Sequence, residues 1–187
     1  PFSAHFDLDP QKNHESLSVV IPWNSRTFQY TSKHNTIPAS GYVRLGDEEV
    51  RFGGDDCFAT LDLGRGIWPR QFIWNWGAAS GYQKGRLIGL NLGGKWTDGT
   101  NMNENGICID GRLTKISEDL VWEYDSNDYM KPWRIYAPKT GMVDLKFRPI
   151  LERSGALKIL FYRFIPFQMF GYYEGMIVNE NGEEINV

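Results

Sequence analysis

The densest group of residues that could do chemistry lies between positions 62 and 77. It contains Asp62, Arg65, Trp68, Trp74 and Trp76. One interpretation is the rim of a pocket, in which the Arg65 guanidinium binds an anion or a polar head group and the tryptophans line an apolar cavity. The alternative is a structural corner, where the arginine packs on tryptophan and bonds to backbone carbonyls. The corner is the commoner arrangement for such residues.

A second polar stretch, residues 98–111, contains the carboxylates Asp98, Glu104 and Asp110. These oxygens could hold a hard cation, but their spacing does not match an EF-hand loop. Glu104 or Asp110 could instead act as a general acid or base at the mouth of a cavity. Two β-turns with side-chain hydrogen bonds to the backbone also explain the stretch, and we favour this reading for the loop as a whole. Glu104 is the best single carboxylate candidate, because it precedes an expected strand.

Other catalytic and metal motifs find no support. The three histidines, His5, His14 and His34, do not have metal-ligand spacing, so we expect no metal site. The chain contains no Gly-x-Ser-x-Gly elbow, P-loop or dinucleotide-binding fingerprint, and we expect no cofactor. The two cysteines, Cys57 and Cys108, have no histidine nearby in sequence. Thiol catalysis and a disulfide framework are therefore not indicated.

Charge and hydropathy exclude two classes of partner. The net charge is −3 and no long basic block occurs, so nucleic-acid binding has no electrostatic support. No stretch is apolar for long enough to span a bilayer, because the longest candidate, residues 157–170, is interrupted by Arg163, Pro166 and Gln168. We also expect no signal peptide. We therefore expect a cytoplasmic protein without a membrane span.

The elements that must position these residues read as strands. Aromatic residues make up 14% of the chain, and aromatics favour strands. No window shows convincing helical periodicity, so we expect an all-β fold with little helix, either an antiparallel barrel or a strongly curved sandwich. In the strand expected at 71–76, Phe72, Trp74 and Trp76 share one face. The expected strands are residues 17–23, 28–31, 42–45, 50–52, 71–76, 86–92, 106–110, 112–116, 120–124, 133–137, 143–147, 157–164, 168–178 and 183–187.

An ordered series of short motifs covers nearly the whole chain. The motifs are Ile21-Pro22-Trp23, Ala39–Val43, Leu61–Trp68, Trp74–Gly81, Gly89–Gly93, Glu104-Asn105, Asp110-Gly111, Tyr129–Trp133, Phe147–Pro149 and Phe170–Gly175. In this order they resemble the domain-of-unknown-function 2804 family, specifically its C-terminal part. The resemblance implies that residues 1–187 form a single β-barrel-like domain, which is the C-terminal half of a longer two-domain protein.

That family is similar in outline to the carotenoid hydratase and tocopherol cyclase-like group, which has two lipocalin-like β-domains. The similarity implies a calycin-type barrel and an apolar, lipid-like or isoprenoid-like ligand. The hydratase relatives protonate an alkene with a carboxylic acid in an apolar cavity, where desolvation raises the pKa of the acid. The carboxylates in matching motifs here are Asp62, Glu104 and Asp110.

Three functional hypotheses follow. The leading one is a lipocalin-like domain that binds a hydrophobic small molecule. The second is a hydratase or cyclase that acts on an isoprenoid alkene. The third is a structural module that packs against a missing N-terminal half or a homodimer partner. The ligand-binding candidates of the leading hypothesis are Arg65, Trp68, Trp74, Trp76, Asn91 and Trp133.

Overall fold

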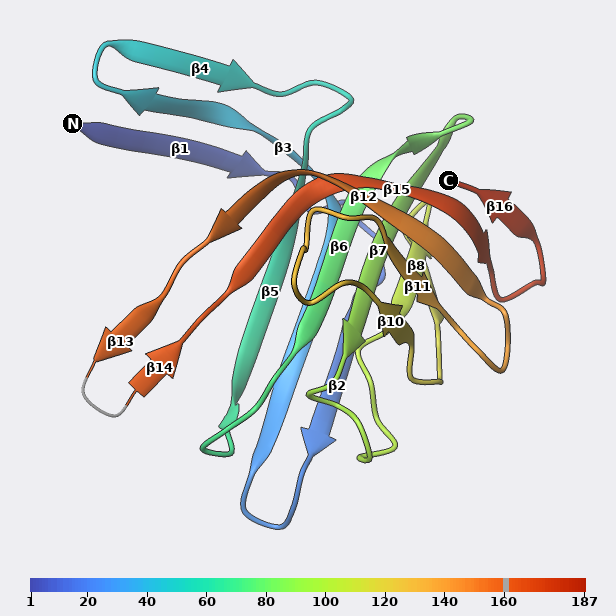
Figure 1. Cartoon of the computed structure of the whole chain (residues 1–187). Helices are drawn as coiled ribbons and strands as arrows, with labels where there is room; N and C mark the ends of the chain where they lie inside the picture. The colour runs from blue at the N-terminus through green and yellow to red at the C-terminus, as the bar shows by residue number, and fades with distance from the viewer. Residues whose placement is uncertain (160–161) are drawn as a thin grey trace. The chain divides into compact units, whose positions relative to one another are not determined.

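A computed structural model describes residues 1–159 and 162–187, and these residues form sixteen strands and no helix (Figure 1). All strand pairs are antiparallel. The chain divides into two compact units, Pro1–Asp119 and Leu120–Val187. The expectation of an antiparallel all-β protein is confirmed. Over the described residues none of the sheets closes into a barrel.

The first unit contains two sheets. In the first sheet the long strand β3 is central, because it pairs with four other strands. The second sheet has the order β6-β7-β8-β9. The strands are β1 (Phe2–Leu8), β2 (Leu17–Pro22), β3 (Phe28–Leu45), β4 (Glu48–Phe52), β5 (Phe58–Ile67), β6 (Asn75–Gln83), β7 (Arg86–Gly94), β8 (Gly106–Ile109) and β9 (Arg112–Lys115).

Tight turns set the register of these hairpins. Lys84 and Gly85 connect β6 to β7 and both have positive φ, at 50° and 79°. Asp110 and Gly111 connect β8 to β9 with φ of 50° and 83°. Two successive positive φ values are typical of the type I′ turn, whose twist matches the strands that it joins. These short connections fix which side chains of β7 and β8 face the rest of the unit.

The second unit has a sheet of order β10-β11-β12-β15-β16 and the separate pair β13-β14. Its buried apolar residues include Ile135, Val143, Leu145 and Ile177, each at most 1% exposed. Its strands are β10 (Val121–Glu123), β11 (Trp133–Tyr136), β12 (Val143–Ser154), β13 (Leu157–Ile159), β14 (Tyr162–Phe164), β15 (Phe167–Val178) and β16 (Glu184–Asn186). Each strand of the five-stranded sheet overlaps a segment that the sequence predicted as a strand.

Some predicted elements differ from the structure. The strand expected at 71–76 is wrong for its first four residues, because β6 begins only at Asn75. The strand expected at 157–164 is two strands, β13 and β14, and residues 160–161 between them lie outside the described part of the chain. Strands β1 and β5 were not predicted. β5 includes Asp62 and Arg65, so these residues belong to a regular strand and not to a corner.

Candidate functional site

One face of β3 is unusually polar for a buried surface. Gln29, Thr31 and Lys33 are buried, whereas the alternating Phe28 and Tyr30 are about two-fifths exposed. Strands β2 and β5 flank this part of β3. A buried polar group must find partners or it costs free energy. The partners of these side chains define the candidate site.

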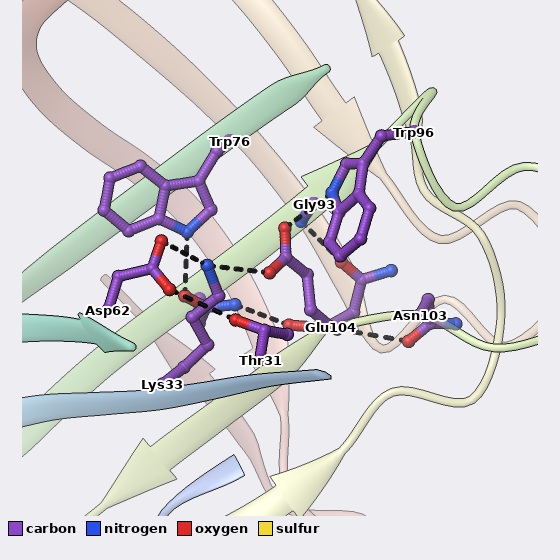
Figure 2. Close-up of polar contacts among 10 residues, drawn as sticks. Thr31, Lys33, Asp62, Trp76, Gly93, Trp96, Asn103 and Glu104 are labelled. Carbon is purple, nitrogen blue, oxygen red and sulfur yellow. Dashed lines mark hydrogen bonds and ion pairs between the residues drawn. The ribbon is translucent and has the colours of Figure 1, made fainter. Parts of the chain in front are cut away.

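Lys33 is the centre of this site (Figure 2). Its Nζ atom lies 2.7 Å from Asp62 Oδ2 on β5 and 2.9 Å from Glu104 Oε2, in the segment before β8. The second contact is an ion pair without the alignment of a hydrogen bond. The Lys33 ammonium also lies 5.0 Å from the centre of the Trp76 ring, a cation–π geometry. Thr31 Oγ1 donates to Asp62 Oδ1 at 3.1 Å, which orients that carboxylate.

Glu104 is the buried acid of the site. Its Oε1 atom accepts a hydrogen bond of 2.8 Å from the Trp96 indole N–H. A Cβ atom on Gly93 would lie 2.5 Å from Glu104 Cγ, so only glycine at position 93 leaves room for this carboxyl. Burial raises the pKa of Glu104, while the nearby Lys33 ammonium and the hydrogen bond from Trp96 oppose the shift. The carboxyl is therefore more easily protonated than an exposed glutamate.

Two amide side chains hold the strands around Glu104. Asn91 Nδ2 donates to the Glu104 carbonyl at 2.5 Å, and Asn91 Oδ1 accepts from the Trp76 indole N–H at 2.9 Å. Asn105 Oδ1 accepts from the Gly93 N–H at 2.6 Å. These bonds fix the backbone on both sides of Glu104. The position of the carboxyl is thus determined by β7 as well as by its own segment.

A cluster of aromatic rings extends from Glu104 to the surface. Trp96 is buried, and its ring centre lies 5.4 Å from that of Trp68. The cluster continues from Trp68 to Phe72 at 4.4 Å and from Phe72 to Trp74 at 5.6 Å. Trp68, Phe72 and Trp74 are 36%, 41% and 37% exposed. We call these three residues the ring shelf. Trp76, which is 39% exposed, lies separately over the Lys33 ammonium.

Side chains fill the space beside Lys33. A cavity of about 10 Å³ lies there, which is close to the minimum for one water molecule. Its lining includes Lys33, Asn35, Asn91 and Cys108. This volume can hold a water molecule and is too small for a lipid-like ligand. The exposed rings of the ring shelf, and not this cavity, therefore offer an apolar surface large enough for such a ligand.

The structure brings several predicted residues together and separates others. Trp68 and Trp74 belong to the ring shelf, and Trp76 and Asn91 lie beside Lys33 and Glu104. Arg65 is exposed on β5 and, three residues after Asp62, points to the opposite face of that strand. Asp110 lies in the β8–β9 turn, where it accepts from the Leu87 N–H and pairs with Arg86. Arg65 and Asp110 therefore lie apart from Lys33.

Trp133 belongs to the second unit. It lies on β11, where its ring contacts Tyr124 and Phe147 and its indole N–H donates to the Tyr129 carbonyl at 2.8 Å. Trp133 thus has partners within its own unit.

Over the described residues there is no group of three His, Cys, Asp or Glu side chains arranged to hold a metal ion.

Sequence reasoning missed Lys33, Trp96 and the thiol–imidazole contact. His14 Nε2 lies 3.7 Å from Cys108 Sγ and 3.2 Å from Thr36 Oγ1, although His14 and Cys108 are far apart in sequence. Burial raises the pKa of the Cys108 thiol, so this contact holds a protonated thiol and not an activated nucleophile. The sequence offered one signal. Lys33 lies two residues after Thr31 and four after Gln29, so strand alternation places the three side chains on one face.

The arrangement can do two kinds of chemistry. The ring shelf can contact an apolar molecule, and Asp62, whose side chain is 43% exposed, offers a polar contact beside Lys33. Glu104 can hold a proton in a site largely removed from water.

In the described part of the chain, no helix is long and apolar enough to cross a membrane.

Comparison with known proteins identifies a family. The family model described as Domain of unknown function (DUF2804) matches residues 1–187, which is the full length of the chain. Searches of curated proteins and of solved structures found no match. The chain therefore belongs to the DUF2804 family.

Proposed function

We propose that the first unit binds a hydrophobic small molecule, lipid-like or isoprenoid-like, on the ring shelf. The observation that carries this proposal is the continuous contact from exposed Trp74 through Phe72 and Trp68 to buried Trp96. Aromatic side chains present large apolar areas at low entropic cost. The antiparallel all-β construction supports a lipocalin-like binding module, and the ligand lies against the rings because side chains occupy the space beside Lys33.

Calorimetric titration of the chain with isoprenoid alcohols and fatty acids tests this proposal. Phe72→Ala and Trp74→Ala should each weaken binding about tenfold, since truncating a buried aromatic contact commonly costs more than 1 kcal/mol. Tyr172→Ala is the matched control, because Tyr172 is an exposed aromatic residue of the second unit. The proposal fails if no ligand of these classes binds, or if the control weakens binding as much as the shelf variants.

A hydratase or cyclase acting on an isoprenoid alkene is the second candidate. It is favoured by the buried Glu104 carboxyl, whose pKa is raised by desolvation. In the hydratase reaction the Glu104 proton would pass to an alkene carbon and leave a carbocation. Water would then form the new C–O bond and return a proton to the carboxylate. Asp62 and Lys33 would keep the local charge balanced during this transfer.

Incubation with isoprenoid alkenes followed by mass spectrometry tests the second candidate. A hydratase yields a product heavier by one water, and a cyclase yields an isomer with fewer double bonds. Glu104→Gln should abolish either product, because an amide cannot donate the proton at this position. Asp110→Asn should leave the rate unchanged, since Asp110 lies in the β8–β9 turn. Product formed equally by Glu104→Gln and the native chain would exclude the mechanism.

A further inference from the structure

The three-stranded end of the first sheet, formed by β1, residues 39–45 of β3, and β4, has one apolar face. Directly opposite residues of an antiparallel pair lie on the same face, and residues alternate between faces along each strand. Phe2 pairs with Leu45, Ala4 with Val43, and Val43 with Val50. The members of this apolar face are Phe2, Ala4, Phe6, Leu8, Val43, Leu45, Val50 and Phe52.

The opposite face of the same strands is polar and internally satisfied. Arg44 and Arg51 both pair with Glu49, and both guanidinium groups lie over the Tyr42 ring. His5 stacks on Tyr42 at 5.9 Å. A sheet with one polar and one apolar face normally buries the apolar face. Here the polar face is the one whose side chains already have partners.

The apolar face remains uncovered. Phe2 is 70% exposed, Phe6 59%, Leu45 66% and Val50 66%. At roughly 200 Å² for an aromatic side chain, Phe2 and Phe6 alone expose on the order of 250 Å². With the aliphatic members the face reaches the order of 500 Å², the size of patches that mark interaction sites. Two such faces in contact would bury on the order of 1,000 Å², which meets the lower limit for a specific interface.

We propose that this apolar face is covered by the same face of a second copy of the chain. A two-fold interface brings a surface against itself, so the surface must not carry charges that repel their symmetry mates. Glu48, at the end of β4, is the one charged residue of these strands on the apolar face, so the rest of that face has no charge to repel its symmetry mate. A membrane surface is disfavoured, because these strands hold two arginines against Asp7, Glu48 and Glu49, and anionic lipid attracts basic segments.

Light scattering coupled to size exclusion tests this interface on the full chain. We expect a molar mass of twice the chain's 21.5 kDa. Val50→Glu and Phe2→Glu should both return it to that of one chain, because each buries a charge in the interface. Ser3→Glu, on the opposite face of β1, should leave the dimer intact. A native chain that is monomeric, or a dimer that persists in both glutamate variants, overturns the proposal.

Two further measurements separate misfolding and other occupants from loss of the interface. In a Cys57→Ser background, Val43→Cys on the central strand of the face should form a disulfide between copies under oxidising conditions, whereas Ser40→Cys on the opposite face of the same strand should not. The reverse pattern overturns the proposal without requiring a destabilised variant.

Co-sedimentation with phosphatidylcholine–phosphatidylserine vesicles tests whether a lipid surface covers the apolar face instead. A monomer that sediments with vesicles shows a lipid occupant instead. The binding proposed for the ring shelf is independent of every one of these outcomes.

Discussion

Lys33 and Glu104 place an ammonium 2.9 Å from a carboxylate, with side chains only 5% and 1% exposed. Lys33 comes from β3 and Glu104 from the segment before β8, so the pair connects the two sheets of the first unit. Transfer of two charges out of water is costly, and their attraction offsets this only when both partners are present. The pair is therefore a point where a single substitution has a large effect.

A double-mutant cycle should measure this coupling. Lys33→Met removes the cation that pairs with the buried Glu104 carboxyl. We expect a loss of about 3 kcal/mol in the free energy of unfolding. Glu104→Gln alone should cost less, because Gln retains an acceptor for the Trp96 N–H. The double variant should be more stable than the sum of the single effects predicts. Urea unfolding followed by tryptophan fluorescence measures all four proteins, and additive effects would show that the ion pair contributes no coupling.

Glycine at position 93 should be required by the Glu104 side chain. In Gly93→Ala the added Cβ atom would lie 2.5 Å from Cγ and 2.6 Å from Oε1 of Glu104. We expect a loss of about 1–3 kcal/mol in the free energy of unfolding, the usual cost of overpacking. Gly81→Ala in the neighbouring strand β6 is the control, because open space surrounds its Cβ position. Equal stability of the two variants would show that the packing at Gly93 is not limiting.

Sequence reasoning succeeded where local signals determine the strand. Ile88, Leu90 and Leu92 are buried in β7, which covers the strand expected at 86–92, and the strands expected at 106–110 and 112–116 correspond to β8 and β9. It failed at 71–76, because Phe72 and Trp74 are held by ring contacts in an irregular segment and not by strand pairing. Aromatic propensity alone does not distinguish these two situations.

The candidate site was predictable only in part. Glu104 was identified as a candidate because it precedes a strand. Its partner Lys33, however, lies 71 residues earlier in the sequence. Within β3, aromatic Phe28 and Tyr30 are more exposed than polar Gln29 and Thr31. Ordinary patterning places the apolar residues inside. A buried polar network reverses that choice through long-range partners, which a local pattern does not contain.

The pH dependence of stability should reveal the proton on Glu104. Burial raises the pKa of this group in the folded state, so the folded protein binds the proton more tightly than the unfolded chain. Its contribution to stability is then fully present below the unfolded pKa and is lost as the pH rises through the folded pKa. Glu104→Gln lacks this titration. The difference in unfolding free energy, native minus variant, should therefore decrease as the pH rises from about 4.5, the ordinary glutamate value, toward neutrality.

Other carboxylates make the subtraction necessary. Hydrogen bonds from arginine lower the pKa of Asp144 and Glu174, so their contributions have the opposite sign and are lost as the pH falls. These groups are present in both proteins and cancel in the difference. A difference that is flat, or that increases with pH, would show that the Lys33 ion pair outweighs desolvation at Glu104.

The two thiols should differ in reactivity. Cys108 is buried on β8, and burial raises the pKa of its thiol, so little thiolate forms near neutral pH. Cys57 is partly exposed between β4 and β5. In the native chain Ellman's reagent should therefore modify Cys57 first, and Cys108 should react only when the first unit opens. Cys57→Ser should remove the fast phase, and Cys108→Ala should preserve it. A fast phase that persists in Cys57→Ser would mean that the His14 contact exposes Cys108 or activates it.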